Sequence, residues 1–149
     1  TYSPLSNVSP LLAGLSSDLV IHSHLCSGTA AIECAFHGIP TLLIDREGAY
    51  KSKFYDMPVG KIIFKDWPSA ILAIKDHFFN NNHIKNFGNW EKYIHIFDPF
   101  KDSKGSYRIG SYLNSLIQGF EKGLSREEVL SESAMKYKKK WGEDKVIIR

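Results

Sequence analysis

The chain has 149 residues, of which 43% are hydrophobic and 23% charged, so it can bury one core but hardly two. Nineteen Lys and Arg side chains against sixteen Asp and Glu give a net charge of +3, too small to indicate nucleic acid as the main partner. No apolar run approaches the roughly 20 residues of a transmembrane helix and no leader pattern opens the sequence, so we expect a soluble protein. The two cysteines, Cys26 and Cys34, are too few for a disulfide scaffold and fit a reducing cytoplasm.

The N-terminal third of the sequence predicts two strands with a helix between them. Residues 18–22 form a short, nearly all-apolar run, typical of a strand covered on both faces. Residues 29–37 are rich in alanine, follow a serine that can cap a helix, and are stopped by Gly38 and then Pro40. Residues 41–44 are again apolar and β-branched. Because this order favours a right-handed βαβ unit, we expect an α/β fold with a Rossmann-like parallel sheet flanked by helices.

The rest of the chain continues the alternation and then becomes helical. We expect a short helix near residues 11–14, a polar candidate binding loop over 45–58, a third strand over 60–64, a helix from Trp67 to Phe79, and two closing helices over 107–122 and 125–141. The first closing helix would gather these apolar side chains on one face: Ile109, Tyr112, Leu113, Leu116, Ile117 and Phe120. The second opens with the capping-box pattern of Ser125 and Glu128. We interpret residues 1–149 as a single domain with a helical C-terminal extension at about 107–142.

The turn between the first predicted strand and the first long helix contains residues that indicate ligand binding. Backbone N–H groups at a helix N-terminus are unpaired and carry partial positive charge, so they bind phosphate oxygens. Here Gly28 would allow a ligand to approach the backbone closely, and the hydroxyls of Ser27 and Thr29 would donate further hydrogen bonds. Glu33 follows one turn later on the same face as Thr29, where its carboxylate could accept hydrogen bonds from two sugar hydroxyls. The pattern predicts a diphosphate and a ribose as ligands.

Two other interpretations of this region stay open. Ser-Gly-Thr is a good helix start in any α/β protein, and the alanines that follow also allow close packing of a helix on a sheet. His22, His24 and Cys26 alternate along the sequence, which could form a metal site on an extended segment, but no fourth ligand stands at short spacing. We expect no metal.

The stretch over residues 18–44 resembles the donor-nucleotide half of GT-B-fold glycosyltransferases; it reads DLVIHSHLCSGTAAIECAFHGIPTLLI. It is similar to lipid A disaccharide synthase and, more distantly, to UDP-N-acetylglucosamine 2-epimerase. The C-terminal part is similar to bacterial surface-polysaccharide biosynthesis proteins. The resemblance implies that Ser27, Gly28 and Thr29 contact the donor diphosphate and that Glu33 contacts its ribose.

The resemblance also implies donor contacts from the ends of both strands. The loop that contains Arg46 and Glu47 looks like the family segment that borders the donor. The guanidinium of Arg46 suits a phosphate, although a solvated loop charge is the alternative. His22 and Ser23 would face the same crevice, because α/β sheets bind ligands at the carboxyl ends of their strands. The implied substrate is a UDP-linked sugar, with no cofactor and no divalent metal.

The implied function is transfer of a sugar from a nucleotide diphosphate in polysaccharide or glycolipid biosynthesis. In GT-B enzymes the acceptor side and its usual base belong to the N-terminal half, which we expect to lie outside this sequence. No catalytic residue is therefore assigned, and the chain by itself is expected to be inactive. A sugar-nucleotide epimerase and a non-catalytic assembly or regulatory module on the same scaffold are the alternatives. Retained nucleotide binding would favour either enzyme over the module.

Further partners are expected at the sheet edge and at the C-terminal helix. Three strands are fewer than the roughly six of a doubly wound half, so the edge at residues 18–22 should be covered by another chain, a second copy or residues 2–9. The lysine-rich end of the last helix, Lys136 to Lys140, is a solvated face that complements the helix dipole or, alternatively, a peripheral contact with an anionic membrane. The expected location is the cytoplasm, with a peripheral position at the inner membrane as the alternative.

Overall fold

The computed structural model describes residues 9–25, 28–80 and 82–146. Contacts divide the chain into two compact units, Thr1–Pro99 and Phe100–Arg149. The helical extension expected at about 107–142 falls inside the second unit. The single domain expected over residues 1–149 stays a prediction.

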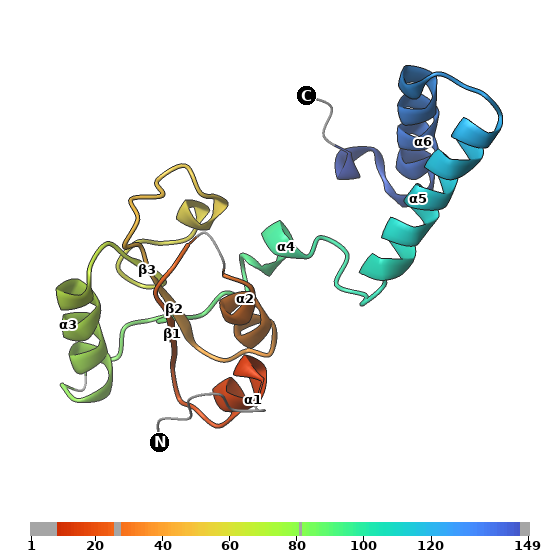
Figure 1. The fold of residues 1–149 in the computed structure, drawn as a ribbon. Helices are drawn as coiled ribbons and strands as arrows, with labels where there is room; N and C mark the ends of the chain where they lie inside the picture. Colours follow the sequence, from red (N-terminus) through yellow and green to blue (C-terminus); the bar gives the residue numbers. More distant parts are fainter. Residues whose placement is uncertain (1–8, 26–27, 81, 147–149) are drawn as a thin grey trace. The chain divides into compact units, whose positions relative to one another are not determined.

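The first unit is built on a parallel sheet of three strands: β1 (Val20–His22), β2 (Thr41–Ile44) and β3 (Ile63–Phe64), in the order β1-β2-β3. Ile21 is in register with Leu42, and Leu43 with Ile63. Every residue of β2 is buried, as expected of a central strand covered on both faces. The parallel α/β architecture predicted from the sequence is thus confirmed (Figure 1).

The third strand is shorter than the one expected over residues 60–64. Gly60 has a φ of +82°, a left-handed conformation that no strand continues, and its N–H donates to the carbonyl of Ile63 over 2.7 Å. This turn delays pairing with β2 until Ile63. In the part of the chain that the structure describes, β1 lies at one edge of the sheet. Of residues 2–9, expected as one cover for that edge, all but Ser9 lie outside the described residues.

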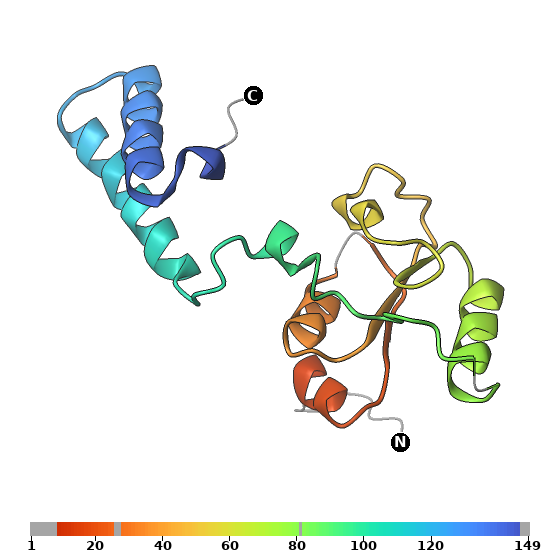
Figure 2. The ribbon, with the colours of Figure 1, turned by 180° about the vertical axis from the view of Figure 1, so that it is seen from behind.

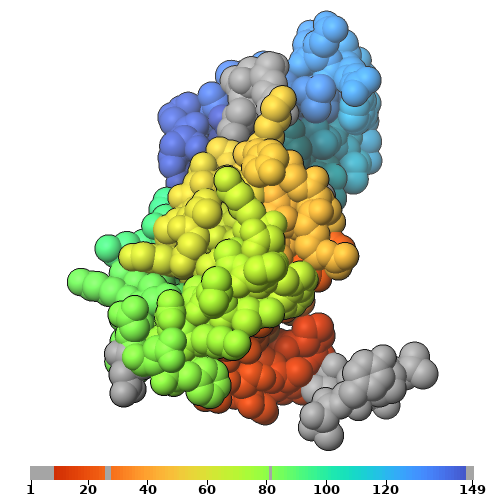
Figure 3. All heavy atoms as spheres, turned by 90° about the vertical axis from the view of Figure 1, so that its left-hand side faces the viewer, coloured from red at the N-terminus to blue at the C-terminus, as the bar shows by residue number. Residues whose placement is uncertain are grey.

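Helices cover both faces of the sheet: α1 (Pro10–Leu15), α2 (Thr29–Phe36), the 3-10 helix η1 (Lys53–Asp56), α3 (Trp67–Phe78) and α4 (Ile94–Phe97). Figures 1 and 2 show α2 on one side of the sheet and α3 on the other. In Figure 3 the yellow-green spheres of α3 cover the side that faces the reader. The side chains of β2 alternate accordingly, with Leu43 packed among Ala31 and Trp90, and Leu42 packed beside Ala70.

The segment between α3 and α4 runs beside the amino end of β2, and it is drawn in green across the sheet in Figure 2. The carbonyl of Gly88 accepts from the N–H of Thr41, and its N–H donates to the carbonyl of Lys61, each over 2.9 Å. The indole Nε1 of Trp90 donates to the carbonyl of Thr41 over 2.8 Å. Trp90 is only 2% exposed, so this segment, which carries no regular apolar period, belongs to the core.

The second unit is a pair of helices, α5 (Gly105–Glu121) and α6 (Arg126–Trp141), followed by the 3-10 helix η2 (Glu143–Lys145). The expected capping box at the start of α6 is present, with Ser125 and Glu128 bonded reciprocally. The guanidinium of Arg108, 4% exposed, lies 3.5 Å from the ring centre of Phe100 and 4.9 Å from that of Trp141, and pairs with Asp102. This cation–π stack fastens the start of α5 to the end of α6.

The apolar face expected on the first closing helix packs only in part. Tyr112 and Leu116 are half-buried, and the ring of Tyr112 meets that of Tyr137 on α6 edge-on at a centroid distance of 6.0 Å. Ile109, Leu113, Ile117 and Phe120 are each more than half exposed, whereas the fully buried positions of the helix are Arg108 and Gly119. The helical period identifies an amphipathic helix but does not say which side meets a neighbour, and here small and polar residues allow the close approach to α6. Within the described residues, no helix combines the length and apolar character needed to cross a membrane.

Replacing Gly119 by alanine should loosen the helical pair. The added Cβ would stand 2.9 Å from Cγ2 of Val129 on α6, so the helices must shift, at a cost of about 1–3 kcal/mol in the free energy of unfolding. Gly110 is the matched control on the same helix, because a Cβ there meets no atom within 4 Å. Gly110→Ala should instead stabilise by about 0.5–1 kcal/mol through helix propensity. Urea unfolding followed by circular dichroism compares the two, and equal effects would contradict the close contact.

Three of the four lysines that end α6 have partners within the unit. Lys136 lies 3.7 Å from Glu132, and Lys138 lies 3.4 Å from Glu143. The ammonium of Lys140 donates to the hydroxyl of Tyr107 over 3.3 Å. Such surface contacts contribute little stability. The solvated face and the contact with a membrane both stay predictions.

Candidate functional site

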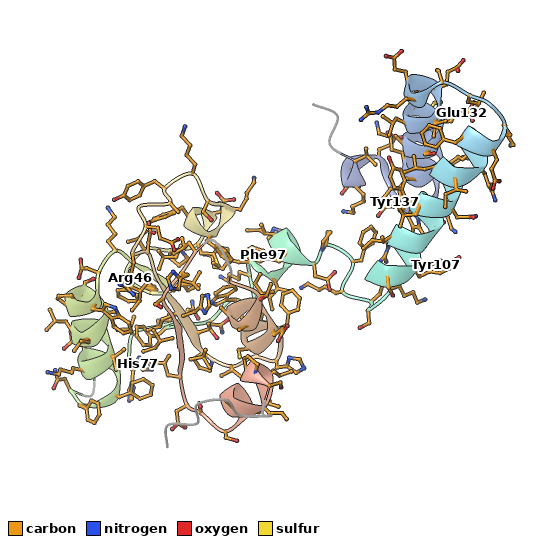
Figure 4. All side chains as sticks on the ribbon, viewed as in Figure 1. Arg46, His77, Phe97, Tyr107, Glu132 and Tyr137 are labelled. Atoms are coloured by element: carbon orange, nitrogen blue, oxygen red, sulfur yellow. The ribbon has the colours of Figure 1, made fainter. Side chains whose placement is uncertain are left out.

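The polar residues singled out in the sequence gather at the carboxyl edge of the sheet. β1 ends at His22, α2 begins at Thr29, and Asp45 directly follows the last residue of β2. In a parallel sheet these points share one edge, the place where α/β proteins bind ligands. Figure 4 shows Arg46 at this edge, whereas His77 lies toward the other end of the unit, near the last turn of α3.

Asp45 organises the loop after β2. Its Oδ1 accepts hydrogen bonds from the N–H groups of Glu47 over 3.1 Å and of Ala49 over 3.2 Å, and its Oδ2 accepts one from the hydroxyl of Tyr55 over 2.6 Å. The residue is only 5% exposed. A buried carboxylate with its acceptors used in this way fixes the backbone that presents the exposed Arg46.

Burial and hydrogen bonding have opposite effects on the pKa of the Asp45 carboxyl group. Burial by itself raises the pKa of Asp45, but the hydrogen bonds from Tyr55 and from the backbone of the loop outweigh it and hold the pKa below its ordinary value. Burial, together with the negative charge of Asp45, raises the pKa of Tyr55. At neutral pH the pair is therefore a carboxylate that accepts a hydrogen bond from a neutral phenol.

A second contact joins the segment after β1 to the same loop. Nδ1 of His24 lies 2.7 Å from Oε1 of Glu47, and the ring of His24 meets that of His22 edge-on at a centroid distance of 6.3 Å. Nε2 of His22 is buried and has no hydrogen-bond partner among the described residues. Ser23, between the two histidines, is half-buried. The contact of His24 with Glu47 thus connects the segments that follow β1 and β2.

The helix α2 begins with Gly28 as its N-cap residue, and Gly28 has no side chain that could cap the helix. The hydroxyl cap expected from Ser27 lies outside the described residues and stays a prediction. A Cβ on Gly28 would stand 2.9 Å from Cζ of Phe54, which means that the ring of Phe54 fills the space that a side chain would need. Thr29 and Glu33 are both exposed, one turn apart on α2. Ser27 and Cys26 lie outside the described residues.

The structure thus brings His22, Ser23, Arg46 and Glu47 to one edge, where α2 also begins. Sequence reasoning missed two functional contributors, Asp45 as organiser of the loop and Tyr55 as its hydrogen-bond donor. An aspartate directly after a buried strand is the signal that could have identified the first. Over residues 9–25, 28–80 and 82–146, no group of three or more metal-ligating side chains occurs; the triad with Cys26 includes a residue outside that part.

Comparisons with protein-family models, with curated proteins and with solved structures found no match to this chain.

Proposed function

We propose that the first unit binds the nucleotide diphosphate of an activated sugar, as the donor-binding C-terminal part of a GT-B-fold glycosyltransferase of polysaccharide or glycolipid biosynthesis. One observation carries the proposal: the end of β1, the start of α2 and the loop after β2 converge at the carboxyl edge of a parallel sheet, with the first and third joined by the contact of His24 with Glu47. Ligands of α/β sheets bind at this edge.

Each part of the nucleotide would have a partner of suitable chemistry. The first-turn N–H groups of α2, which no described side chain caps, favour the negative charge of a diphosphate. The exposed guanidinium of Arg46 would pair with a phosphate oxygen. Glu33 would accept hydrogen bonds from the ribose hydroxyls, and the nucleotide expected is UDP. When the bond from the sugar to the diphosphate breaks, the helix end and Arg46 would stabilise the charge of the leaving group.

Calorimetric titration of the full chain with UDP, CDP and GDP tests the proposal. We expect one nucleotide to bind, and both Arg46→Ala and Glu33→Ala to weaken it about tenfold, since each removes one charge-assisted hydrogen bond. Lys85→Ala and Glu91→Ala are the matched controls, because they remove the same charges from exposed positions of the first unit, on the segment that runs beside the amino end of β2. Gly28→Val is a poor probe, because its side chain would collide with Phe54 and disturb the core.

The outcomes separate the alternatives. Binding that both variants weaken and neither control affects would support the donor site. Binding that is insensitive to Glu33 but lost with Arg46 would indicate a general phosphate site without ribose recognition. A folded chain that binds none of the three nucleotides would overturn the proposal for this chain and favour a non-catalytic module.

A further inference from the structure

The opposite edge of the first unit contains a hollow of about 500 Å³. It lies between the C-terminal end of α2 and the segment that leads from α3 to α4. Its apolar wall is made by Phe36, Ile39, Pro40, Phe87, Trp90 and Ile94. A mostly apolar lining with a few polar groups at the rim is the usual character of a small-molecule site, and the volume falls in the usual range of roughly 300–1,000 Å³.

The walls of this hollow are held by hydrogen bonds that are already formed. Gly88 is bonded through its carbonyl to Thr41 and through its N–H to Lys61, and Trp90 is bonded through its indole N–H to Thr41. On the far wall, Nδ1 of His77 accepts a hydrogen bond from the N–H of Ile84 over 3.0 Å. Binding would therefore require little ordering of the backbone, which favours affinity.

A smaller polar hollow of about 180 Å³ adjoins the first, because both are lined by Asn86, Asn89 and Glu91. Lys61 and Lys92 also line the smaller hollow. In the part of the chain that the structure describes, neither lysine forms a salt bridge, and both are exposed. Two cationic side chains against the single carboxylate of Glu91 leave this hollow with a net positive charge.

We propose that the two hollows together bind an amphipathic anion: a single apolar chain lies against the wall of Phe36, Ile39 and Trp90, and a carboxylate or phosphate head lies between Lys61 and Lys92. The apolar hollow supplies affinity by removing the chain from water, and the lysines select the sign of the head group. Glu91 lines both hollows, so its carboxylate disfavours an anionic head group in the part that they share. The site lies at the edge opposite to the nucleotide site, so the inference does not depend on nucleotide binding.

Calorimetric titration of the full chain with dodecanoate, below its micellar concentration, is the first test. We expect saturable binding at one site, weakened by about fourfold or less for each methylene removed from the probe. Dodecyltrimethylammonium, with the same chain length and a cationic head, should bind about tenfold more weakly. The Lys61→Gln/Lys92→Gln double variant should abolish that difference, whereas Lys85→Gln, an exposed lysine outside both hollows, should preserve it.

A second measurement locates the chain of the probe. In a Trp67→Phe/Trp141→Phe variant, Trp90 is the remaining tryptophan, and bromine at the end of dodecanoate should quench its fluorescence to a saturable limit. Preference for the cationic probe, affinity unaffected by the double lysine variant, or quenching absent despite binding would each overturn the proposal. So would a folded chain that binds neither probe, an outcome that would leave the hollow to a protein partner.

Discussion

Gly88→Ala should lower the free energy of unfolding by about 3 kcal/mol or more, through conformational strain and overpacking together. Gly88 has a φ of +66°, where a side chain is strained, and its added Cβ would stand 2.8 Å from the backbone nitrogen of Thr41. That nitrogen cannot move aside without losing its hydrogen bond to the carbonyl of Gly88, at the amino end of β2. Equilibrium unfolding in urea measures the loss, followed by the fluorescence of the buried Trp90 in a Trp67→Phe/Trp141→Phe background.

Gly60→Ala is the control that separates strain from collision. Gly60 has a φ of +82°, but a Cβ there meets no atom within 4 Å. Its substitution should therefore cost only the conformational part, about 1–2 kcal/mol. If the two variants lost the same stability, the close approach of Gly88 to β2 would be refuted.

Asp45→Asn should destabilise the chain by about 2–3 kcal/mol at neutral pH, since hydrogen bonds to a buried charged group are lost or weakened. The variant should also change the pH dependence of stability. Because folding lowers the pKa of Asp45, its carboxylate contributes stability that is fully present above the unfolded pKa of about 3.9 and is lost as the pH falls through the folded value. The gap between the wild type and the variant should therefore narrow below about pH 4.

Asp56→Asn is the control for this titration. Asp56 is exposed and lies 4.0 Å from Lys53, so its substitution should leave stability nearly unchanged across the same pH range. Urea unfolding at a series of pH values measures all three proteins. A gap between the wild type and Asp45→Asn that is constant with pH would mean that the carboxylate is not stabilised by its hydrogen bonds.

Local signals in the sequence were sufficient for the elements around β2. Residues 41–44 form the strand as expected, and α2 begins at Thr29 and ends at Phe36, two residues before Gly38, which has a φ of +76°. These elements are specified by neighbouring residues, through an apolar run in one case and a glycine stop in the other. The packing face of α5 was not predictable in this way, because it depends on Val129, which comes ten residues after Gly119 in the sequence.

For the candidate site, the sequence predicted the position but not the contacts within it. Its position followed from the order of strand, helix and strand, which determines where the carboxyl edge lies. Its internal contacts did not, because the pairs His24 with Glu47 and Asp45 with Tyr55 join segments separated by 23 and 10 positions. The periodicity of apolar residues does not predict contacts between segments this far apart in the sequence. Only the folded chain brings these partners together.

The ring of Phe54 against Gly28 has a consequence for how this protein can change over evolutionary time. A glycine at this turn is required for packing whether or not a ligand binds there. Purifying selection for a foldable chain would therefore retain it even in a descendant that had lost its ligand. Exposed residues such as Glu33 and Arg46 carry no such packing constraint and would drift once binding ceased. In a comparison of diverging relatives, retention or loss of Glu33 and Arg46 would therefore indicate whether binding persists, whereas retention of the glycine would not.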